Sequence, residues 1–178
     1  MIDQIDNQRF LPYGKQNVSE QDINEVINVL KSDFLTQGPR VSLFEESISR
    51  KVNSKYSVAS NSATSSLHLA CMALGLGKDD FLWTTPITFV ASANCGLYCG
   101  ANVDFVDINQ ETGLIDINKL KKKLKHAESI NKLPKILVAV HFAGSSCDMK
   151  SIFDLSKKYN FFIIEDACHA LGAEYEYK

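Results

Sequence analysis

The sequence predicts an α/β fold with three layers, in which helices flank both faces of a sheet of parallel strands. Short apolar runs alternate along the chain with longer segments that carry apolar residues at helical spacing. The runs are almost wholly hydrophobic, which is typical of parallel strands buried on both faces. No internal repeat, low-complexity tract or interdomain linker interrupts this alternation. We therefore expect one sheet with right-handed crossover helices.

The segment before the sheet is expected to be an irregular arm followed by two helices. Pro12 and Gly14 disfavour a continuous helix over residues 1–17. Ser19 is a candidate N-cap because Asp22 follows three residues later. The apolar faces expected for the two helices are Ile23, Val26, Ile27 and Leu30 in the first and Val41, Phe44, Ile48 and Val52 in the second.

Five short apolar runs are the candidate strands, with helical segments between them. The strands are expected at Tyr56–Ala59, Phe81–Thr84, Val103–Val106, Ile136–Val140 and Phe161–Ile164. The helices are expected after Asn61 (buried face Leu67, Ala70, Cys71 and Leu74), at Ile87–Tyr98, at Lys119–His126 and from Met149 to Tyr159. The lysine-rich segment 119–126 is interpreted as a solvated face.

Composition excludes several classes of partner and compartment. A net charge of −2 over 178 residues gives no reason to expect nucleic acid or an acidic membrane surface as a partner. The five cysteines lack the paired spacing of a zinc site and are interpreted as reduced thiols. The polar stretch 1–10 is unlike a signal peptide, and no apolar run approaches the roughly 20 residues that span a bilayer. The expected location is the cytoplasm.

The candidate chemistry lies where the predicted strands end. Glu165 and Asp166 follow the apolar run 161–164, and His169 comes three residues later. In an open parallel sheet the ligand crevice lies off the carboxyl ends of the strands. A carboxylate there can hold a cationic ring nitrogen or a metal ion; alternatively, Asp166 caps the following turn.

Two other strand ends carry complementary groups. Ala63 and Thr64 open a helix whose first N–H groups can bind a phosphate, although a plain N-cap is the alternative. Phe89 follows the strand 81–84 and can stack on a planar cofactor or belong to the core. Together with an acid and His169, these groups describe a pyridoxal phosphate pocket, since an acid beside the pyridine nitrogen keeps that nitrogen protonated.

Metal and dinucleotide sites are the competing interpretations. His141, Asp166 and His169 could approach one another, but a single carboxylate without HExxH-like spacing gives little support, and no metal is expected. Gly75 and Gly77 close a helix instead of opening one, so the dinucleotide fingerprint is absent. An NAD-linked reductase therefore ranks last.

Six motifs give the chain a clear resemblance. They are Leu11-Pro-Tyr-Gly-Lys-Gln16, residues 30–39 (LKSDFLTQGP), Asn61-Ser-Ala-Thr64, Thr85-Pro-Ile-Thr-Phe-Val-Ala91, His141-Phe-Ala-Gly144 and residues 165–172 (EDACHALG). As an ordered set they resemble the sugar aminotransferases of the DegT/DnrJ type, pyridoxal phosphate enzymes of the aspartate-aminotransferase fold (fold type I). Within that family the resemblance is strongest to the branch that aminates C4 of a UDP-4-keto-6-deoxy-N-acetylhexosamine in pseudaminic acid biosynthesis.

The resemblance implies roles for individual residues. Ala63 and Thr64 would bind the cofactor phosphate, Phe89 would lie against the pyridine ring, Asp166 would pair with the ring nitrogen and His169 would lie near O3′. The residues that match the family's nucleotide-sugar contacts are Tyr13, Asp33, Phe34, Leu35 and Thr36, with Ala63 beside them. Glutamate as amino donor and a homodimer are further implications of the family.

The resemblance also implies what the sequence lacks. The family's Schiff-base lysine lies downstream of the last matched motif, and Lys178 comes too early to be that lysine. We therefore expect no catalytic residue here, an arm with helices over 1–55, a partial cofactor-binding domain over 56–178 and no C-terminal small domain. Strand 56–59 would then lack its partner, and strand 161–164 would be a free edge.

Three hypotheses follow from this pattern. The first is a sugar aminotransferase half that becomes active when a complementing C-terminal half supplies the lysine, the chain alone being silent. The second is a non-catalytic module that binds pyridoxal phosphate or a partner. The third is a dehydratase of the type that lacks the lysine, whose distinguishing position is not in this sequence.

Overall fold

The computed structural model describes residues 14–176. The chain forms two compact units, residues 1–44 and residues 45–178, and each is described by itself. We call them the N-terminal unit and the sheet unit.

The N-terminal unit contains α1 (Glu20–Leu30) and the first residues of α2 (Pro39–Lys51). Ser19 is the N-cap of α1, as predicted, and forms a capping box with Asp22. The Ser19 Oγ accepts the Asp22 N–H at 3.3 Å and the Asp22 Oδ2 accepts the Ser19 N–H at 2.7 Å. Neither helix has a buried residue, so their apolar faces remain exposed.

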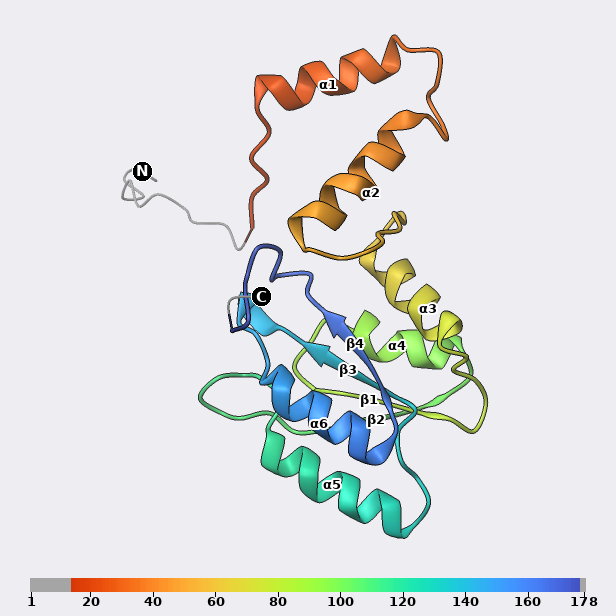
Figure 1. The fold of residues 1–178 in the computed structure, drawn as a ribbon, viewed down its shortest axis with the longest axis vertical. Coiled ribbons are helices and arrows are strands. Elements are labelled where there is room, and N and C mark those ends of the chain that lie inside the picture. The colour runs from red at the N-terminus through yellow and green to blue at the C-terminus, as the bar shows by residue number, and fades with distance from the viewer. Residues whose placement is uncertain (1–13, 177–178) are drawn as a thin grey trace, which may run out of the picture. The chain divides into compact units, whose positions relative to one another are not determined.

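The sheet unit is built on four parallel strands, which confirms the predicted fold class. They are β1 (Phe81–Thr84), β2 (Asn102–Phe105), β3 (Ile136–Val140) and β4 (Phe162–Asp166). Their order across the sheet is β2-β1-β3-β4, so β1 pairs with β2 and β3, and β4 pairs with β3 (Figure 1). The carboxyl ends of β3 and β4 meet where Val140 pairs with Asp166.

Helices cover both faces of this sheet and create two cores (Figure 1). On one face α5 (Ile117–Ser129) and α6 (Met149–Tyr159) pack against Trp83, Leu137 and Ala139. On the other, α3 (Ala63–Ala73) and α4 (Ala91–Tyr98) pack against Leu82, Ile136 and Val138. The alternation of side chains along β1 and β3 thus supplies both cores.

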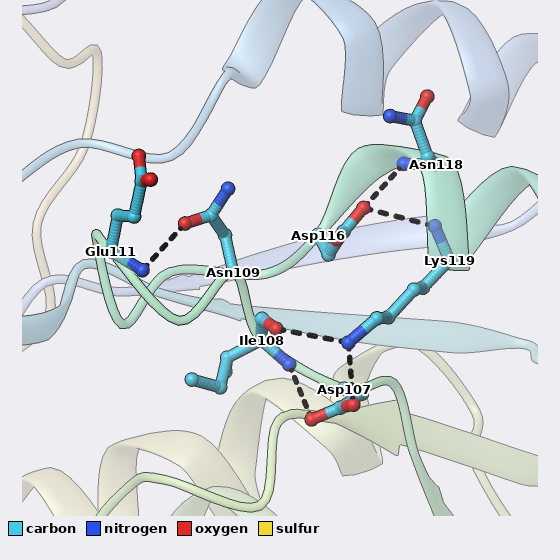
Figure 2. A network of polar contacts seen from close by, with 7 residues as sticks. All are labelled: Asp107, Ile108, Asn109, Glu111, Asp116, Asn118 and Lys119. Atoms are coloured by element: carbon cyan, nitrogen blue, oxygen red, sulfur yellow. Dashed lines mark hydrogen bonds and ion pairs between the residues drawn. The ribbon is translucent and has the colours of Figure 1, made fainter.

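The loop between β2 and α5 is tied down by its own polar groups (Figure 2). Asp116 caps α5 by accepting the N–H groups of Asn118 and Lys119 through Oδ1, at 2.8 and 3.1 Å. The Lys119 Nζ donates to the Asp107 Oδ2 at 2.6 Å and to the Ile108 carbonyl at 3.3 Å. This hydrogen bond lowers the pKa of the Asp107 carboxyl and raises that of Lys119. The lysine-rich face is therefore partly paired with acids beside it.

Three strand predictions are wrong in detail, one of them by a single residue, since β2 is Asn102–Phe105 and not Val103–Val106. Tyr56–Ala59 forms no strand; the Ala59 N–H donates to the Glu45 Oε1 at 2.8 Å, and no described strand pairs with this segment. The strand predicted at Phe161–Ile164 is β4, Phe162–Asp166; among the described residues it is the free edge that the resemblance implies, and Phe162 is 51% exposed instead of buried. In addition, α4 begins at Ala91 rather than Ile87, since residues 85–90 form turns.

No helix within residues 14–176 is both long and apolar enough to cross a membrane.

Candidate functional site

A cavity of about 320 Å³ lies in the sheet unit, at the carboxyl ends of β3 and β4. Its wall contains all five residues that the sequence predicts for cofactor binding: Ala63, Thr64, Phe89, Asp166 and His169. The remaining lining residues are Leu67, Thr88, Ala91, Val140, His141, Phe142 and Cys168. Residues more than 100 positions apart in the sequence therefore meet at one crevice, where parallel sheets bind ligands.

Asp166 is the buried acid of this cavity. It is the last residue of β4 and its exposed fraction is 8%. Its Oδ2 accepts the Ser92 hydroxyl at 2.7 Å, and its Oδ1 accepts the Cys168 N–H at 3.3 Å. Both donors are neutral, and no ion pair involves Asp166 among the described residues. A buried carboxylate without a cation beside it is suited to a cationic ligand group.

The N-terminus of α3 offers hydrogen-bond donors to the same cavity. Ser62 caps the helix, and its Oγ accepts the Ser65 N–H at 3.2 Å. The N–H groups of Ala63 and Thr64 precede the first intrahelical bond, and within the described residues neither has an acceptor. These amides and the Thr64 hydroxyl fit a phosphate, which the helix dipole also favours.

Phe89 and His169 complete the wall as exposed groups. Phe89 follows β1 and is 72% exposed, so it is available to a planar ligand and is not a core residue. His169 lies after β4 on a loop held close to the turn η1 (Phe142–Gly144). A Cβ on Gly144, whose φ is +84°, would lie 2.9 Å from the His169 carbonyl oxygen. Gly144 therefore permits the close approach that places this loop at the cavity.

His141 lines this cavity and also a second one of about 600 Å³, to whose wall Glu165 and Glu174 belong. The His141 Nδ1 accepts the Cys147 N–H at 3.1 Å, and the Nε2 lies 2.8 Å from the Glu165 Oε2. The Cys147 and Glu165 side chains raise the pKa of His141 to about 9. The His141 ring is thus held by two hydrogen bonds, one on each nitrogen. Between residues 14 and 176 no group of three or more His, Cys, Asp or Glu side chains is arranged as a metal site.

The residues predicted to contact a nucleotide sugar belong to different parts of the chain. Tyr13 lies outside the described residues. Asp33, Phe34, Leu35 and Thr36 form the exposed connection between α1 and α2, in the N-terminal unit. Ala63, the remaining residue of that set, belongs to the sheet unit and lines the cavity.

The sequence reasoning missed Ser92 and Thr88. The Ser92 hydroxyl, which is fully buried, lies 2.8 Å from the Thr88 Oγ1 and donates to Asp166. The spacing of Thr88 and Ser92 could have indicated that their hydroxyls lie close together. The two residues are four apart just after a strand end and can face the same side of a helical turn. Nothing in the sequence, however, links Ser92 to a carboxylate 74 positions away.

The fold and the cavity together define a class, the α/β enzymes that hold a phosphorylated planar cofactor at the ends of parallel strands. Residues 16–178 match the DegT/DnrJ/EryC1/StrS aminotransferase family, and the chain belongs to this family. Pyridoxal 5′-phosphate is the cofactor of these aminotransferases.

Three comparisons illustrate the relationship. The chain is 44% identical over 167 residues to the UDP-4-amino-4,6-dideoxy-N-acetyl-beta-L-altrosamine transaminase of Campylobacter jejuni, covering 93% of this chain and 43% of that protein. The structure resembles Helicobacter pylori PseC, an aminotransferase involved in the biosynthesis of pseudoaminic acid, with a TM-score of 0.83 and 35% identity over 94% of this chain and 44% of that one. It also resembles the PLP form of the putative sugar aminotransferase Spr1654 from Streptococcus pneumoniae, with a TM-score of 0.81 and 28% identity over 91% and 44% of the two chains.

The chain spans less than half the length of the curated relatives it matches, between 41% and 43% of each. The comparisons therefore cover one part of those proteins. Within that part the groups on the cavity wall fit the cofactor. The helix amides can donate to a phosphate, the aromatic face can lie against a ring, and the carboxylate, which has no ion-pair partner among the described residues, can accept from a ring nitrogen.

Proposed function

We propose that this chain forms the pyridoxal phosphate pocket of a nucleotide-sugar aminotransferase. The observation that carries the proposal is Asp166, a buried carboxylate with neutral donors on both oxygens, on the wall of a cavity that also presents Phe89 and the N-terminus of α3. A pyridinium N–H is a cationic donor that the Asp166 carboxylate can bind. The cofactor, when bound, supplies an electron sink for the carbanion formed during amine transfer.

In this proposal each residue has a binding or orienting role. The Ala63 and Thr64 amides with the Thr64 hydroxyl hold the phosphate, and Phe89 lies against the ring face. Asp166 keeps the ring nitrogen protonated, and His169 lies beside the phenolic oxygen. Asp33–Thr36 and Tyr13 contact the nucleotide sugar.

We further propose the substrates from the relatives. Amino transfer would run from glutamate to C4 of a UDP-4-keto-6-deoxy-N-acetylhexosamine, as a step of pseudaminic acid or a related polysaccharide biosynthesis. The proposed assembly is a homodimer or a complex with a complementing C-terminal half, in the cytoplasm. The proposed domain limits are 1–55 for the arm and its helices and 56–178 for the cofactor-binding part.

The chain carries no lysine in the wall of the cavity within its described residues. A Schiff-base lysine is what makes the cofactor a covalent, reactive group in this chemistry. We therefore expect the chain by itself to bind pyridoxal phosphate without catalysing amine transfer. This feature also favours the second candidate function, a non-catalytic half that binds the cofactor or a partner chain.

The test is equilibrium dialysis of pyridoxal phosphate against the purified chain, with glutamate-dependent amine transfer measured in parallel. We expect saturable binding that Asp166→Asn weakens about tenfold or more, since the variant loses a charge-assisted hydrogen bond. Asp154→Asn, which removes an exposed carboxylate on α6, is the matched control. Thr64→Val should weaken binding of pyridoxal phosphate but not of pyridoxal. Equal affinities for the wild type and Asp166→Asn would refute the proposed role of the acid.

A further inference from the structure

Ser92 lies behind the acid of the cavity, on the first turn of α4. Its exposed fraction is 0%, and its hydroxyl donates to the Asp166 Oδ2 at 2.7 Å. A serine hydroxyl has one proton, so the 2.8 Å contact between Ser92 Oγ and Thr88 Oγ1 must use the Thr88 proton. The three groups therefore have one consistent direction of donation, from Thr88 to Ser92 to Asp166.

The other side of Asp166 is also fixed. The Oδ1 accepts the Cys168 N–H, so each carboxylate oxygen has a protein donor and the plane of the carboxylate is set. The Cys168 bond comes from the neighbouring backbone, two residues along the chain, whereas Ser92 reaches Asp166 from a different element. Removing the Ser92 hydroxyl would leave the Asp166 side chain with hydrogen bonds from the neighbouring Cys168, among the described residues, and freer to change its rotamer.

We propose that Thr88 and Ser92 form a hydroxyl relay whose role is to position Asp166 toward the ring nitrogen of the cofactor. Ser92 is a positioning residue that acts through Asp166, and Thr88 is a positioning residue that acts through Ser92. Because the ligand is the one assigned above, this inference rests on the proposed function. It adds two residues that the strand-end pattern does not predict.

The relay predicts a ranking of pyridoxal phosphate affinities. Ser92→Ala should raise the dissociation constant about tenfold, as expected for a lost hydrogen bond to a charged group. Thr88→Val should have a smaller effect in the same direction, and Thr88→Ser, which keeps the hydroxyl, should restore the wild-type value. Ser156→Ala is the matched control, since Ser156 is also buried and its hydroxyl donates to the Phe153 carbonyl on α6.

A double-mutant cycle separates positioning from general structural support. In an Asp166→Asn background, Ser92→Ala should cause no further loss of cofactor affinity, because its effect passes through the carboxylate. An analogue of pyridoxal phosphate with carbon in place of the ring nitrogen should bind the wild type and Ser92→Ala equally. Equal pyridoxal phosphate affinity for Ser92→Ala and the wild type, or an additive loss in the double variant, would overturn the relay and leave the proposed function standing.

The same four proteins without cofactor provide the second readout. Urea unfolding of the wild type, Ser92→Ala, Asp166→Asn and the double variant should show that the two substitutions are not additive. If the wild type fails to bind pyridoxal phosphate, the proposed function and the positioning role both fall, and the unfolding cycle decides whether the hydroxyl relay itself exists. If the changes in unfolding free energy caused by Ser92→Ala and Asp166→Asn add up in the double variant, the hydroxyl relay is excluded.

Discussion

His141 and Glu165 form a pair of ionisable residues at the boundary of the two cavities. The Cys147 and Glu165 side chains raise the pKa of His141 from an ordinary 6.5 to about 9. A histidine with a higher pKa in the folded than in the unfolded state stabilises the fold below about pH 6.5, and this contribution is lost as the pH rises through about 9. The hydrogen bond from the Cys147 N–H to Nδ1 belongs to the neutral ring, whose proton is then on Nε2, because an imidazolium has no acceptor nitrogen.

We predict that Glu165→Gln lowers the pKa of His141, since it removes the negative charge 2.8 Å from Nε2. Histidine ring signals followed by NMR against pH measure this value, with His141→Gln identifying the signal. Because the Glu165 side chain is 53% exposed, the associated loss of unfolding free energy should be about 1 kcal/mol or less near pH 6.5 and smaller at pH 10.

Glu174→Gln supplies the matched control for that measurement. Glu174 lines the same 600 Å³ cavity but has no hydrogen bond or ion pair with His141. A pKa of His141 that falls equally in both variants would show that the pair geometry is irrelevant and that the overall charge of the cavity sets the value.

Among the secondary-structure elements, the sequence best predicts those strands whose limits depend on the local pattern of apolar residues. The strands Phe81–Thr84 and Ile136–Val140 are confirmed to the residue, because each is a compact apolar run with charged or turn residues beside it. Tyr56–Ala59 has the same local pattern but forms no strand, since a strand also needs a neighbour to accept its hydrogen bonds. Whether a segment has a pairing partner depends on the whole sheet and cannot be predicted from a short stretch of sequence.

The same contrast explains how much of the candidate site the sequence predicts. Asp166, Phe89 and Thr64 each lie near a strand end or a helix start that the sequence pattern predicts, and parallel topology then gathers them at one cavity. Ser92 gains its role because α4, packed against β1 and β2, brings its hydroxyl to Asp166 at the end of β4, and a buried serine in a helix has no pattern of its own. The hydrogen bond from Ser92 to Asp166 is therefore visible in the three-dimensional structure and not in the sequence.

The exposed edge of β4 leads to a prediction about association. Within residues 14–176 this strand pairs with β3 and has no second neighbour, and Phe162 on it is 51% exposed. An exposed apolar edge strand can pair with another chain, and a lysine on such an edge opposes that pairing. We predict that Phe162→Lys lowers the self-association of the 178-residue chain, measured by size exclusion with light scattering, and leaves its circular dichroism unchanged.

Phe153→Lys distinguishes an edge effect from a general gain of charge. Phe153 is 53% exposed on α6, so the two substitutions change charge and hydrophobicity equally at sites of similar exposure. The prediction is contradicted if Phe153→Lys reduces association as much as Phe162→Lys does.

For the whole molecule, burial is distributed unequally between the two units. Within residues 14–176 the first buried side chain is Leu67, and both cores are formed by residues of the sheet unit. α1 has its capping box and an ion pair between Arg40 and Glu25, at 2.9 Å. Exposed contacts of this kind contribute little free energy, whereas buried apolar area dominates it.

A variant that begins at Pro39 should therefore keep the fold of the sheet unit. Trp83 is the single tryptophan and is 2% exposed in the core beneath α5 and α6, so its fluorescence follows the unfolding of that unit in urea. We expect the unfolding free energy to change by about 0.5 kcal/mol or less, as for changes away from buried contacts. Leu124→Ala in the full chain, at a fully buried position of α5, should instead cost about 2–5 kcal/mol.

The same truncation separates the two proposed ligand sites. The residues assigned to the cofactor all belong to the sheet unit, whereas Tyr13 and Asp33–Thr36 belong to the N-terminal unit. The variant from Pro39 should bind pyridoxal phosphate with unchanged affinity and should lose affinity for a UDP-N-acetylhexosamine, measured by calorimetry against the full chain. Loss of pyridoxal phosphate binding together with the Trp83 signal would mean that the sheet unit depends on residues 1–38 after all, and that exposed helices contribute more to its stability than their burial indicates.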